Sequence, residues 1–383
     1  MDPAGSRPAG SPEPEAGSQI RSAFDPAVIP ARVFSLNVHA SYACRNSGAC
    51  CNAGWSIPVE AHLRSVVKAD WLVPERGGAC PEYDRRSGLC RIHRDHGETS
   101  LPASCYQFPR HALLDGRGTF VTLSHFCPTA AALLVDFDGP LSICDDPPAF
   151  PAWRVYEGLD ARGEWPPLVK PDVLFDHESF GKWERYLVET ISASSEGVDE
   201  TLARVAATGE RLRSWSADGG PLARWTDDCL AAPVDARSLS TRRYAPFSGS
   251  AAFGRAAATT PPSLEAPLAP RDLEAADTQF VAGSWNAWAP VVLRYVAARA
   301  FASWTAYQSR GIRTQIAELF MTAAILRVEC ARACEARQST LDRRILLEAI
   351  RASDLLLVHL ADRDRLMHWL GEVEEHALTH TRR

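Results

Sequence analysis

Seven of the eleven cysteines in this 383-residue chain lie in one stretch, at Cys44, Cys50, Cys51, Cys80, Cys90, Cys105 and Cys127. Deprotonated thiols grouped in this way ligate zinc ions and iron–sulfur clusters, and oxidised thiols form disulfides. A chain of this length buries enough apolar surface to fold without either. The clustered thiols therefore indicate either a metal centre or a disulfide framework.

The N-terminal sequence favours a metal centre. Residues 1–25 are rich in Pro, Gly, Ser and Glu, whereas a secretory signal needs a basic start and an apolar run. The longest apolar stretch, Leu319 to Val328, is interrupted by Arg327 and is shorter than the ~18 residues of a membrane span. We therefore expect a cytoplasmic protein without a membrane partner, in which the thiols stay reduced.

The spacing of the thiols favours an iron–sulfur cluster over zinc. Structural zinc sites usually contain paired C-x2-4-C spacings, and the seven cysteines include no such pair. Seven thiols also exceed the four that one ion takes, so which four ligate stays open, and zinc remains the alternative. Gly48 and Gly54 bracket Cys50 and Cys51. A turn that gathers thiolates needs the positive φ that glycine tolerates.

Other residues of this stretch have secondary roles in the prediction. Imidazoles also bind iron and zinc, but we expect the three nearby histidines, His93, His96 and His125, to lie beside the metal ligands or at the surface. Trp55 and Phe108 are expected to shield the metal from water. The four cysteines elsewhere are expected to pack as small apolar side chains; they are Cys144, Cys229, Cys330 and Cys334.

The pattern along the chain predicts a mainly α protein, α+β overall, in which an irregular cysteine-rich metal-binding domain with short strands precedes a helical bundle. The expected parts are a disordered tail (1–25), the cysteine-cluster domain (26–150), a helical segment (151–231), a Pro/Gly/Ser/Ala-rich linker (232–275) and the C-terminal bundle (276–383).

Helical periodicity supports the second half of this prediction. It predicts helices over Lys182–Ala193, Glu200–Trp215, Asp277–Gln308, Ile312–Arg337, Leu341–Ala352 and Asp354–Leu378. Ser339, with Asp342 three residues later, has the spacing of a capping box, and Ser353 precedes an apolar run as an N-cap would.

The cysteine segments resemble a known family. CC-x2-GW-x-I at Cys50–Ile57, GLCRIH at Gly88–His93, CYQFPR at Cys105–Arg110 and HFCPTAAALL at His125–Leu134 occur in the order found in flagellin lysine-N-methylases and the related YkgJ-like cysteine-cluster proteins, described as zinc- or iron-chelating. Only Cys44 precedes the double cysteine, which compresses the spacing relative to the methylases. The matching strings cover about a quarter of the chain.

The resemblance implies that the cysteines bind a metal centre. For the methylase branch it implies that a 4Fe-4S cluster supports methyl transfer from S-adenosylmethionine to lysine of a flagellin-like protein. Since a lysine ammonium must lose its proton before it attacks a methyl group, such an enzyme needs a base or a desolvating pocket. Glu82, Asp84 and Glu98 are candidate bases, although each fits an ordinary surface carboxylate.

Three functions follow as hypotheses. The first is a protein-lysine methyltransferase with an iron–sulfur cluster; the second is a non-enzymatic zinc- or iron-binding protein; the third is an interaction module. No G-x-G-x-x-G and no C-x3-C-x2-C run is present, so the sequence does not reveal a methyl-donor site. With a net charge of -6 and both signs mixed, we expect no nucleic-acid partner.

Overall fold

The computed structural model describes residues 32–74, 78–234, 241–260 and 273–375. The predicted disordered tail, 1–25, lies outside these residues. The described chain is mainly helical with a small mixed sheet, which confirms the coarse fold class predicted from sequence. Among the described helices, none combines the length and the apolar character that crossing a membrane requires.

The largest sheet has the strand order β8-β1-β7-β6-β9. Its strands are β1 (Val33–Leu36), β6 (Arg110–Asp115), β7 (Gly118–Leu123), β8 (Ile143–Asp145) and β9 (Gly158–Asp160). Strands β6 and β7 form a hairpin, whereas β1 pairs with β7 in parallel. Adjacent residues such as Phe120 and Val121 enter different apolar clusters, since side chains alternate across a strand. The sheet therefore has a core on each face.

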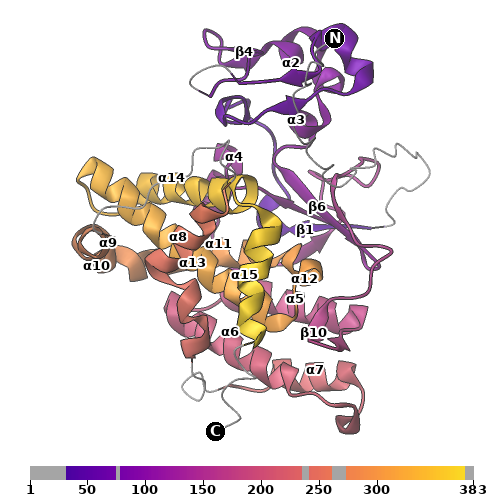
Figure 1. The fold of residues 1–383 in the computed structure, drawn as a ribbon, viewed down its shortest axis with the longest axis vertical. Coiled ribbons are helices and arrows are strands. Elements are labelled where there is room, and N and C mark those ends of the chain that lie inside the picture. Colours follow the sequence, from indigo (N-terminus) through magenta and orange to yellow (C-terminus); the bar gives the residue numbers. More distant parts are fainter. Residues whose placement is uncertain (1–31, 75–77, 235–240, 261–272, 376–383) are drawn as a thin grey trace, which may run out of the picture.

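A separate lobe, here called the cysteine lobe, comprises the described residues between 43 and 107 and lies at the top of Figure 1. Its elements are η2 (Cys50–Asn52), β2 (Ile57–Pro58), η3 (Ala61–Leu63), α1 (Arg64–Val67), β3 (Trp71–Leu72), β4 (Tyr83–Asp84), β5 (Leu89–Cys90), α2 (Arg91–His96), η4 (Glu98–Ser100) and α3 (Ala103–Gln107). Its buried apolar residues are Ile57, Val59, Leu63, Val67, Leu72 and Ile92. This core is small for a unit that stands apart from the rest of the chain.

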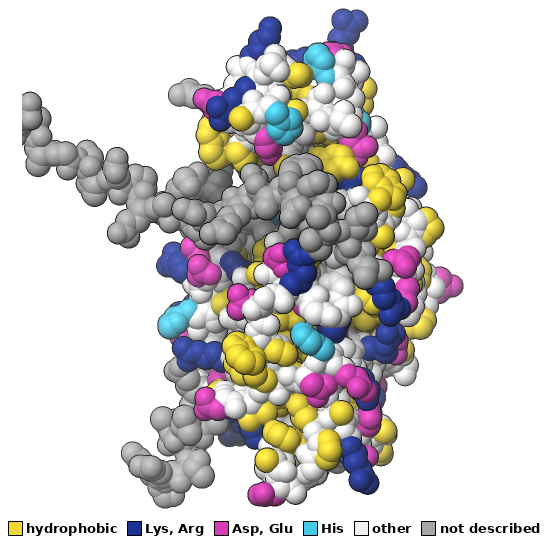
Figure 2. Space-filling model, turned by 90° about the vertical axis from the view of Figure 1, so that its right-hand side faces the viewer, with side chains coloured by type: hydrophobic (Ala, Val, Ile, Leu, Met, Phe, Trp, Pro, Cys, Tyr) yellow, Lys and Arg dark blue, Asp and Glu magenta, His cyan; other side chains and the backbone are white. Residues whose placement is uncertain are grey.

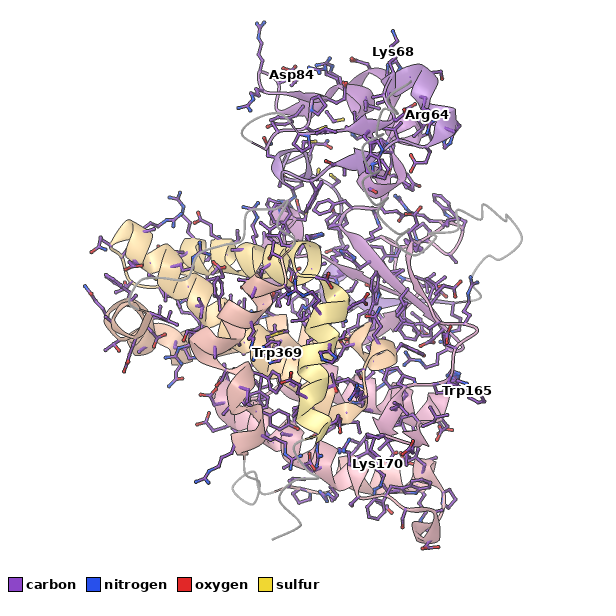
Figure 3. The ribbon with its side chains drawn as sticks, in the orientation of Figure 1. Arg64, Lys68, Asp84, Trp165, Lys170 and Trp369 are labelled. Carbon is purple, nitrogen blue, oxygen red and sulfur yellow. The ribbon has the colours of Figure 1, made fainter. Side chains whose placement is uncertain are left out.

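Charged side chains of both signs lie on the described surface of the molecule. Figure 3 labels Arg64, Lys68 and Asp84 on the outer surface of the cysteine lobe. Figure 2 shows acidic, basic and apolar side chains interspersed on one face of the molecule. That face therefore presents no extended patch of a single charge.

Helix α13 (Ile312–Arg337) is the centre of the helical half and has the bounds predicted from sequence. Helices α6, α8, α11, α14 and α15 pack around it, so it is buried on nearly all sides. The longer helices of this half are α5 (His177–Ser192), α6 (Val198–Arg213), α7 (Leu222–Ala231), α8 (Gly249–Ala258), α11 (Ala289–Ala300), α14 (Arg343–Asp354) and α15 (Arg363–Glu375). Helix α4 (Pro128–Asp136) and the β10 (Leu168–Lys170)–β11 (Val173–Leu174) hairpin precede them.

The structure corrects the predicted linker, 232–275. Its described part contains η7 (Thr241–Phe247) and α8, and the side chains of Tyr244, Phe247 and Phe253 are buried in the main core. Alanine and glycine hide the helical period of α8, because they add little to the contrast between apolar and polar positions. Three aromatic side chains nevertheless anchor this segment by burial.

The predicted caps of the C-terminal helices are also corrected. The N-cap of α14 is Asp342, whose carboxylate accepts a hydrogen bond from the Ile345 N–H at 2.7 Å. Ser353 lies inside α14 and donates to the Ala349 carbonyl. The chain then continues as a π-helical turn, η10 (Leu355–Leu360). The predicted helix 277–308 is divided into η8 (Asp277–Val281), α10 (Ala282–Trp285), η9 (Asn286–Trp288), α11 and α12 (Thr305–Gln308).

The cap assignment gives a first prediction. Replacing Asp342 by Ala removes the side-chain acceptor and should lower the free energy of unfolding by about 1 kcal/mol. Ser339→Ala should change it little, since the Ser339 hydroxyl donates to the neighbouring Thr340 carbonyl and caps no helix. Urea denaturation of both variants measures this difference, and an equal loss in both would contradict the assignment.

Candidate metal centre

Different elements of the cysteine lobe bring five of the seven predicted thiols together. Cys50 and Cys51 lie on the 3-10 turn η2, and the Cys80 N–H donates to the Cys51 carbonyl at 2.7 Å. Cys90 ends β5, and Cys105 lies on α3. Cys80, Cys90 and Cys105 pack against the apolar core of the lobe. Short elements joined by turns thus gather thiols from 56 residues of chain.

The thiol of Cys51 lies between two other sulfur atoms. It hydrogen-bonds to Cys50 and Cys90, and these two bonds raise the pKa of Cys51. The same bonds stabilise the thiolates of their partners, so the pKa of Cys50 is lowered and that of Cys90 falls to about 6. The pKa shifts of the three thiols therefore oppose one another, since that of Cys51 is raised while those of Cys50 and Cys90 are lowered.

Cys80 and Cys105 are the other two thiols of the group, and both lie close enough to Cys50 and Cys90 to be affected by their charges. Burial raises the pKa of both thiols, and the charges of nearby Cys50 and Cys90 raise them further. Like charges in a confined space oppose one another's ionisation. Without a cation, the five thiols therefore cannot all become thiolates near neutral pH.

Backbone N–H groups also point at these sulfurs. The amides of Ile92 and His93, in the first turn of α2, hydrogen-bond to Cys90, and the amide of Glu82 hydrogen-bonds to Cys80. Such bonds stabilise negative charge on sulfur and are one of the means by which proteins tune iron–sulfur clusters. The surroundings of Cys80 and Cys90 thus favour thiolates.

The described residues contain no group of three or more Cys, His, Asp or Glu side chains placed closely enough to hold an ion. The fit to a metal therefore depends on the chemistry of the donors. Five neighbouring sulfurs compete for protons, and a bound cation would stabilise their thiolate forms together. This donor set suits a thiolate-ligated metal centre. The sulfur atoms would have to move closer together to hold the metal.

The two glycines that bracket the double cysteine have the backbone predicted for them. Gly48 has φ +69° and Gly54 has φ +82°, which confirms that the turn uses positive φ. A Cβ atom on Gly48 would also lie 2.7 Å from the Tyr83 ring. Gly48 therefore allows both the turn and the close approach of Tyr83 beside Cys50.

The other two predicted ligands lie in different surroundings. Cys44 is exposed, and its sulfur lies 3.4 Å from the Asn46 amide nitrogen. Cys127 is buried as the N-cap of α4, where its sulfur lies 3.8 Å from the Tyr42 hydroxyl. Proline at the next position suits the first turn of a helix. The Cys127 side chain makes no capping hydrogen bond and is buried in the apolar cluster on one face of the sheet.

The candidate bases lie in surface ion pairs. Glu82 pairs with Arg91, Asp84 with Arg94, and Glu98 with Arg154. These positions suit the reading of the three carboxylates as ordinary surface groups. His93 is half-buried on α2, and His96 is exposed where that helix ends before Gly97.

His125 belongs to a buried histidine group that the sequence did not reveal. Its Nε2 lies 3.2 Å from Nε2 of His39, and its Nδ1 lies 3.6 Å from the Asp354 carboxylate. Asp354 also accepts hydrogen bonds from the His125 amide and, at 2.8 Å, from the Tyr295 hydroxyl. These contacts hold the Asp354 carboxyl pKa well below its usual range. His125, which lies just before α4, therefore connects this part of the chain to Asp354 of α14.

Aromatic rings connect the cysteine lobe to His359 of the helical half. The contact is here called the junction and comprises Trp55, Phe108, His111, Phe126 and His359. Trp55 packs against the lobe core, and its ring lies 4.7 Å from that of His359 on η10. Phe108 and Phe126 contact both rings. Ser124 lies 2.8 Å from His359 Nε2. Trp55 thus packs against the same apolar core as Cys80, Cys90 and Cys105, whereas Phe108 packs against the cluster on one face of the sheet.

The junction keeps its imidazoles neutral. Burial is the main cause that lowers the pKa of His111 to about 4 and that of His359 to about 3. The two rings lie 5.6 Å apart, and both side chains remain half-buried. A π-helical turn carries His359, and such turns occur often at functional sites. The junction is therefore a desolvating surface beside the lobe.

The four remaining cysteines lie apart from the lobe. Cys229, Cys330 and Cys334 are buried in the main core, and Cys144 is half-buried on β8, where its thiol donates to the Ser35 carbonyl. Their surroundings suit the predicted packing role.

Comparisons of the chain with models of protein families, with curated proteins and with solved structures find no match. The fold and the site define a mainly helical protein with a small mixed sheet and a separate, thiol-rich lobe.

The histidine pKa values give a second prediction. A histidine with a lowered pKa takes up its proton less readily in the folded chain than in the unfolded chain. The free energy of unfolding should therefore fall as pH falls from about 6.5 toward 4, by up to about 1.4 kcal/mol per pH unit for each histidine.

Urea denaturation between about pH 7 and pH 5 measures this slope. His111→Gln should flatten the slope, because Gln does not titrate there. The exposed His96→Gln is the matched control and should leave the slope unchanged. A stability that is independent of pH, or a slope that His111→Gln does not alter, would contradict the assignment.

Proposed function

We propose that the cysteine lobe binds an iron–sulfur cluster through four of the five gathered thiols, Cys50, Cys51, Cys80, Cys90 and Cys105. The observation that carries this proposal is the grouping of these five thiols: the Cys80 amide bonds to the Cys51 carbonyl, Cys80, Cys90 and Cys105 pack against one apolar core, and the five thiols influence one another's pKa. A metal centre would take the place of protons on the ligating thiols and offset the repulsion between their thiolate forms. When bound, an iron–sulfur cluster supplies one-electron redox chemistry, and its positively charged core stabilises the thiolate forms of its cysteine ligands.

Two features favour iron–sulfur over a single zinc ion. The lobe gathers more thiols than one tetrahedral ion takes, and backbone amides hydrogen-bond to at least two of the sulfurs. The apolar surroundings formed by Trp55 and the lobe core would limit access of water to a cluster. Zinc held by the same thiols is the alternative, and metal analysis separates the two.

We propose further that the cluster supports methyl transfer from S-adenosylmethionine to lysine of a flagellin-like protein. The matching cysteine segments support this reaction, and so does the junction. Burial that keeps His111 and His359 neutral would also favour the neutral amine of an inserted lysine, because desolvation disfavours its charged form. The junction lies directly beside the lobe, so the amine would be deprotonated next to the cluster.

The third prediction concerns the metal. Protein purified without oxygen should contain iron and acid-labile sulfide and should absorb visible light. Cys51→Ser and Cys90→Ser should each lose most of the iron and part of the stability, because metal binding is partly folding free energy. Cys229→Ser is the matched control outside the lobe, and Cys127→Ser tests the predicted ligand that lies on α4.

Both controls should retain the iron of the unaltered protein. A colourless protein with stoichiometric zinc would overturn the iron–sulfur assignment. Full iron content in Cys51→Ser and Cys90→Ser would remove the lobe as the site.

The fourth prediction concerns the reaction. Incubation with isotope-labelled S-adenosylmethionine and a flagellin-like protein should place the label on lysine Nζ, as peptide mass spectrometry detects. Cys51→Ser should abolish the transfer, whereas Cys229→Ser should retain it. If an iron-loaded protein gives no methyl-lysine with lysine-rich flagellin-like substrates, the enzyme proposal fails and the metal-binding alternative remains.

A further inference from the structure

A second candidate site is a cavity in the helical half. Its volume is about 360 Å³, which lies within the range of ligand pockets in proteins. Helices α6, α8, α10 and α13, the turn η8 and the short helix α9 (Leu273–Ala276) surround it. Figure 1 places these elements in the helical half, away from the cysteine lobe. The cavity is therefore distinct from the proposed metal centre.

One wall of the cavity is apolar. It contains Leu202 of α6, Trp285 of α10, and Phe320, Ala323 and Val328 of α13. An apolar wall of this kind binds the body of a ligand by excluding water from both surfaces. The polar groups of the cavity then decide which ligand binds.

The one basic group that lines the cavity already has partners. Both guanidinium contacts from Arg327 to the Asp277 carboxylate measure 2.7 Å, which makes the pair bidentate. The guanidinium also lies 5.2 Å from the centre of the Trp285 ring. Arg327 is therefore engaged by a carboxylate and an aromatic face, and it offers little to an anionic ligand.

Two further carboxylates face the cavity. Asp199 and Glu274 line it with exposed side chains, and neither forms an ion pair with a basic side chain of the described residues. Among the described residues that line the cavity, Asp199, Glu274 and Asp277 give three carboxylates against the guanidinium of Arg327, a formal charge of -2. Such a cavity attracts cations and disfavours anions.

We propose that this cavity binds a small organic cation with an apolar body. The cationic group would lie near Asp199 and Glu274, and the body would pack against Leu202, Trp285 and Phe320. The sulfonium of a methyl donor and the ammonium of an aromatic amine share this chemistry. The first source rests on the proposed methyl transfer, whereas the second does not.

Isothermal titration of the whole protein tests the site. The probes are benzyltrimethylammonium with neutral benzyl alcohol as its control, and S-adenosylmethionine with S-adenosylhomocysteine, which lacks the sulfonium charge. At least one cation should bind about tenfold more tightly than its uncharged control, and added salt should weaken its binding. Asp199→Asn and Glu274→Gln should each weaken it about two- to fivefold, the range of a solvent-exposed ion pair.

The matched control is Glu200→Gln, which removes a carboxylate from the same first turn of α6 without touching the cavity. It should leave affinity unchanged. Three results would overturn the site: equal affinity for a cation and its uncharged control, no binding at about 10 mM, or equal losses of affinity in Asp199→Asn and Glu200→Gln.

The two pairs of probes show which kind of organic cation the cavity binds. Binding of S-adenosylmethionine supports a sulfonium-binding site apart from the junction, and binding of benzyltrimethylammonium alone supports an amine site unrelated to methyl transfer. Because iron content is measured independently, failure of this cavity leaves the metal proposal standing, and loss of the metal proposal leaves the cavity testable.

Discussion

The competition of five thiols for protons is the constraint on which the cysteine lobe depends. The interaction with Cys51 lowers the pKa of both Cys50 and Cys90, and backbone amides lower them further. The apolar core of the lobe contains six buried side chains, which is little for an independent unit. A metal held by the thiols would supply a cross-link that this core lacks, so metal binding and folding of the lobe are expected to be coupled.

The junction makes the lobe part of the larger molecule. Trp55 follows the double cysteine in sequence and contacts His359, which lies more than 300 residues further along the chain. Asp354 is one turn before His359 and accepts hydrogen bonds from the His125 amide and from Tyr295. The position of the lobe is therefore fixed against the same buried polar network that joins the sheet to the helical half.

Local patterns were predictable from sequence where a single segment determines the outcome. The bounds of α13 and the positive φ of Gly48 and Gly54 follow from periodicity and turn chemistry. The grouping of Cys50, Cys51, Cys80, Cys90 and Cys105 was expected, but density alone could not separate them from Cys44 and Cys127. That separation is a tertiary property, since Cys127 is buried near Tyr42 at the start of α4 and Cys44 is exposed.

The features that sequence missed have physical reasons. The histidine group joins residues from four distant segments, and no spacing connects His39, His111, His125 and His359. The predicted linker hides α8 in alanine and glycine, and three aromatic side chains decide its burial. Asp342 and Ser339 both have side chains that can act as an N-cap. Asp342 is the N-cap because α14, which packs against α13 and α4, begins at Arg343.

Differential alkylation of the thiols tests the central claim most directly. Protein purified without oxygen would be labelled with iodoacetamide before and after chelation of its metal, and each cysteine read by peptide mass spectrometry. We expect at least four of Cys50, Cys51, Cys80, Cys90 and Cys105 to be protected until the metal is removed, while exposed Cys44 is labelled throughout. Equal labelling of these five thiols before and after chelation would contradict it.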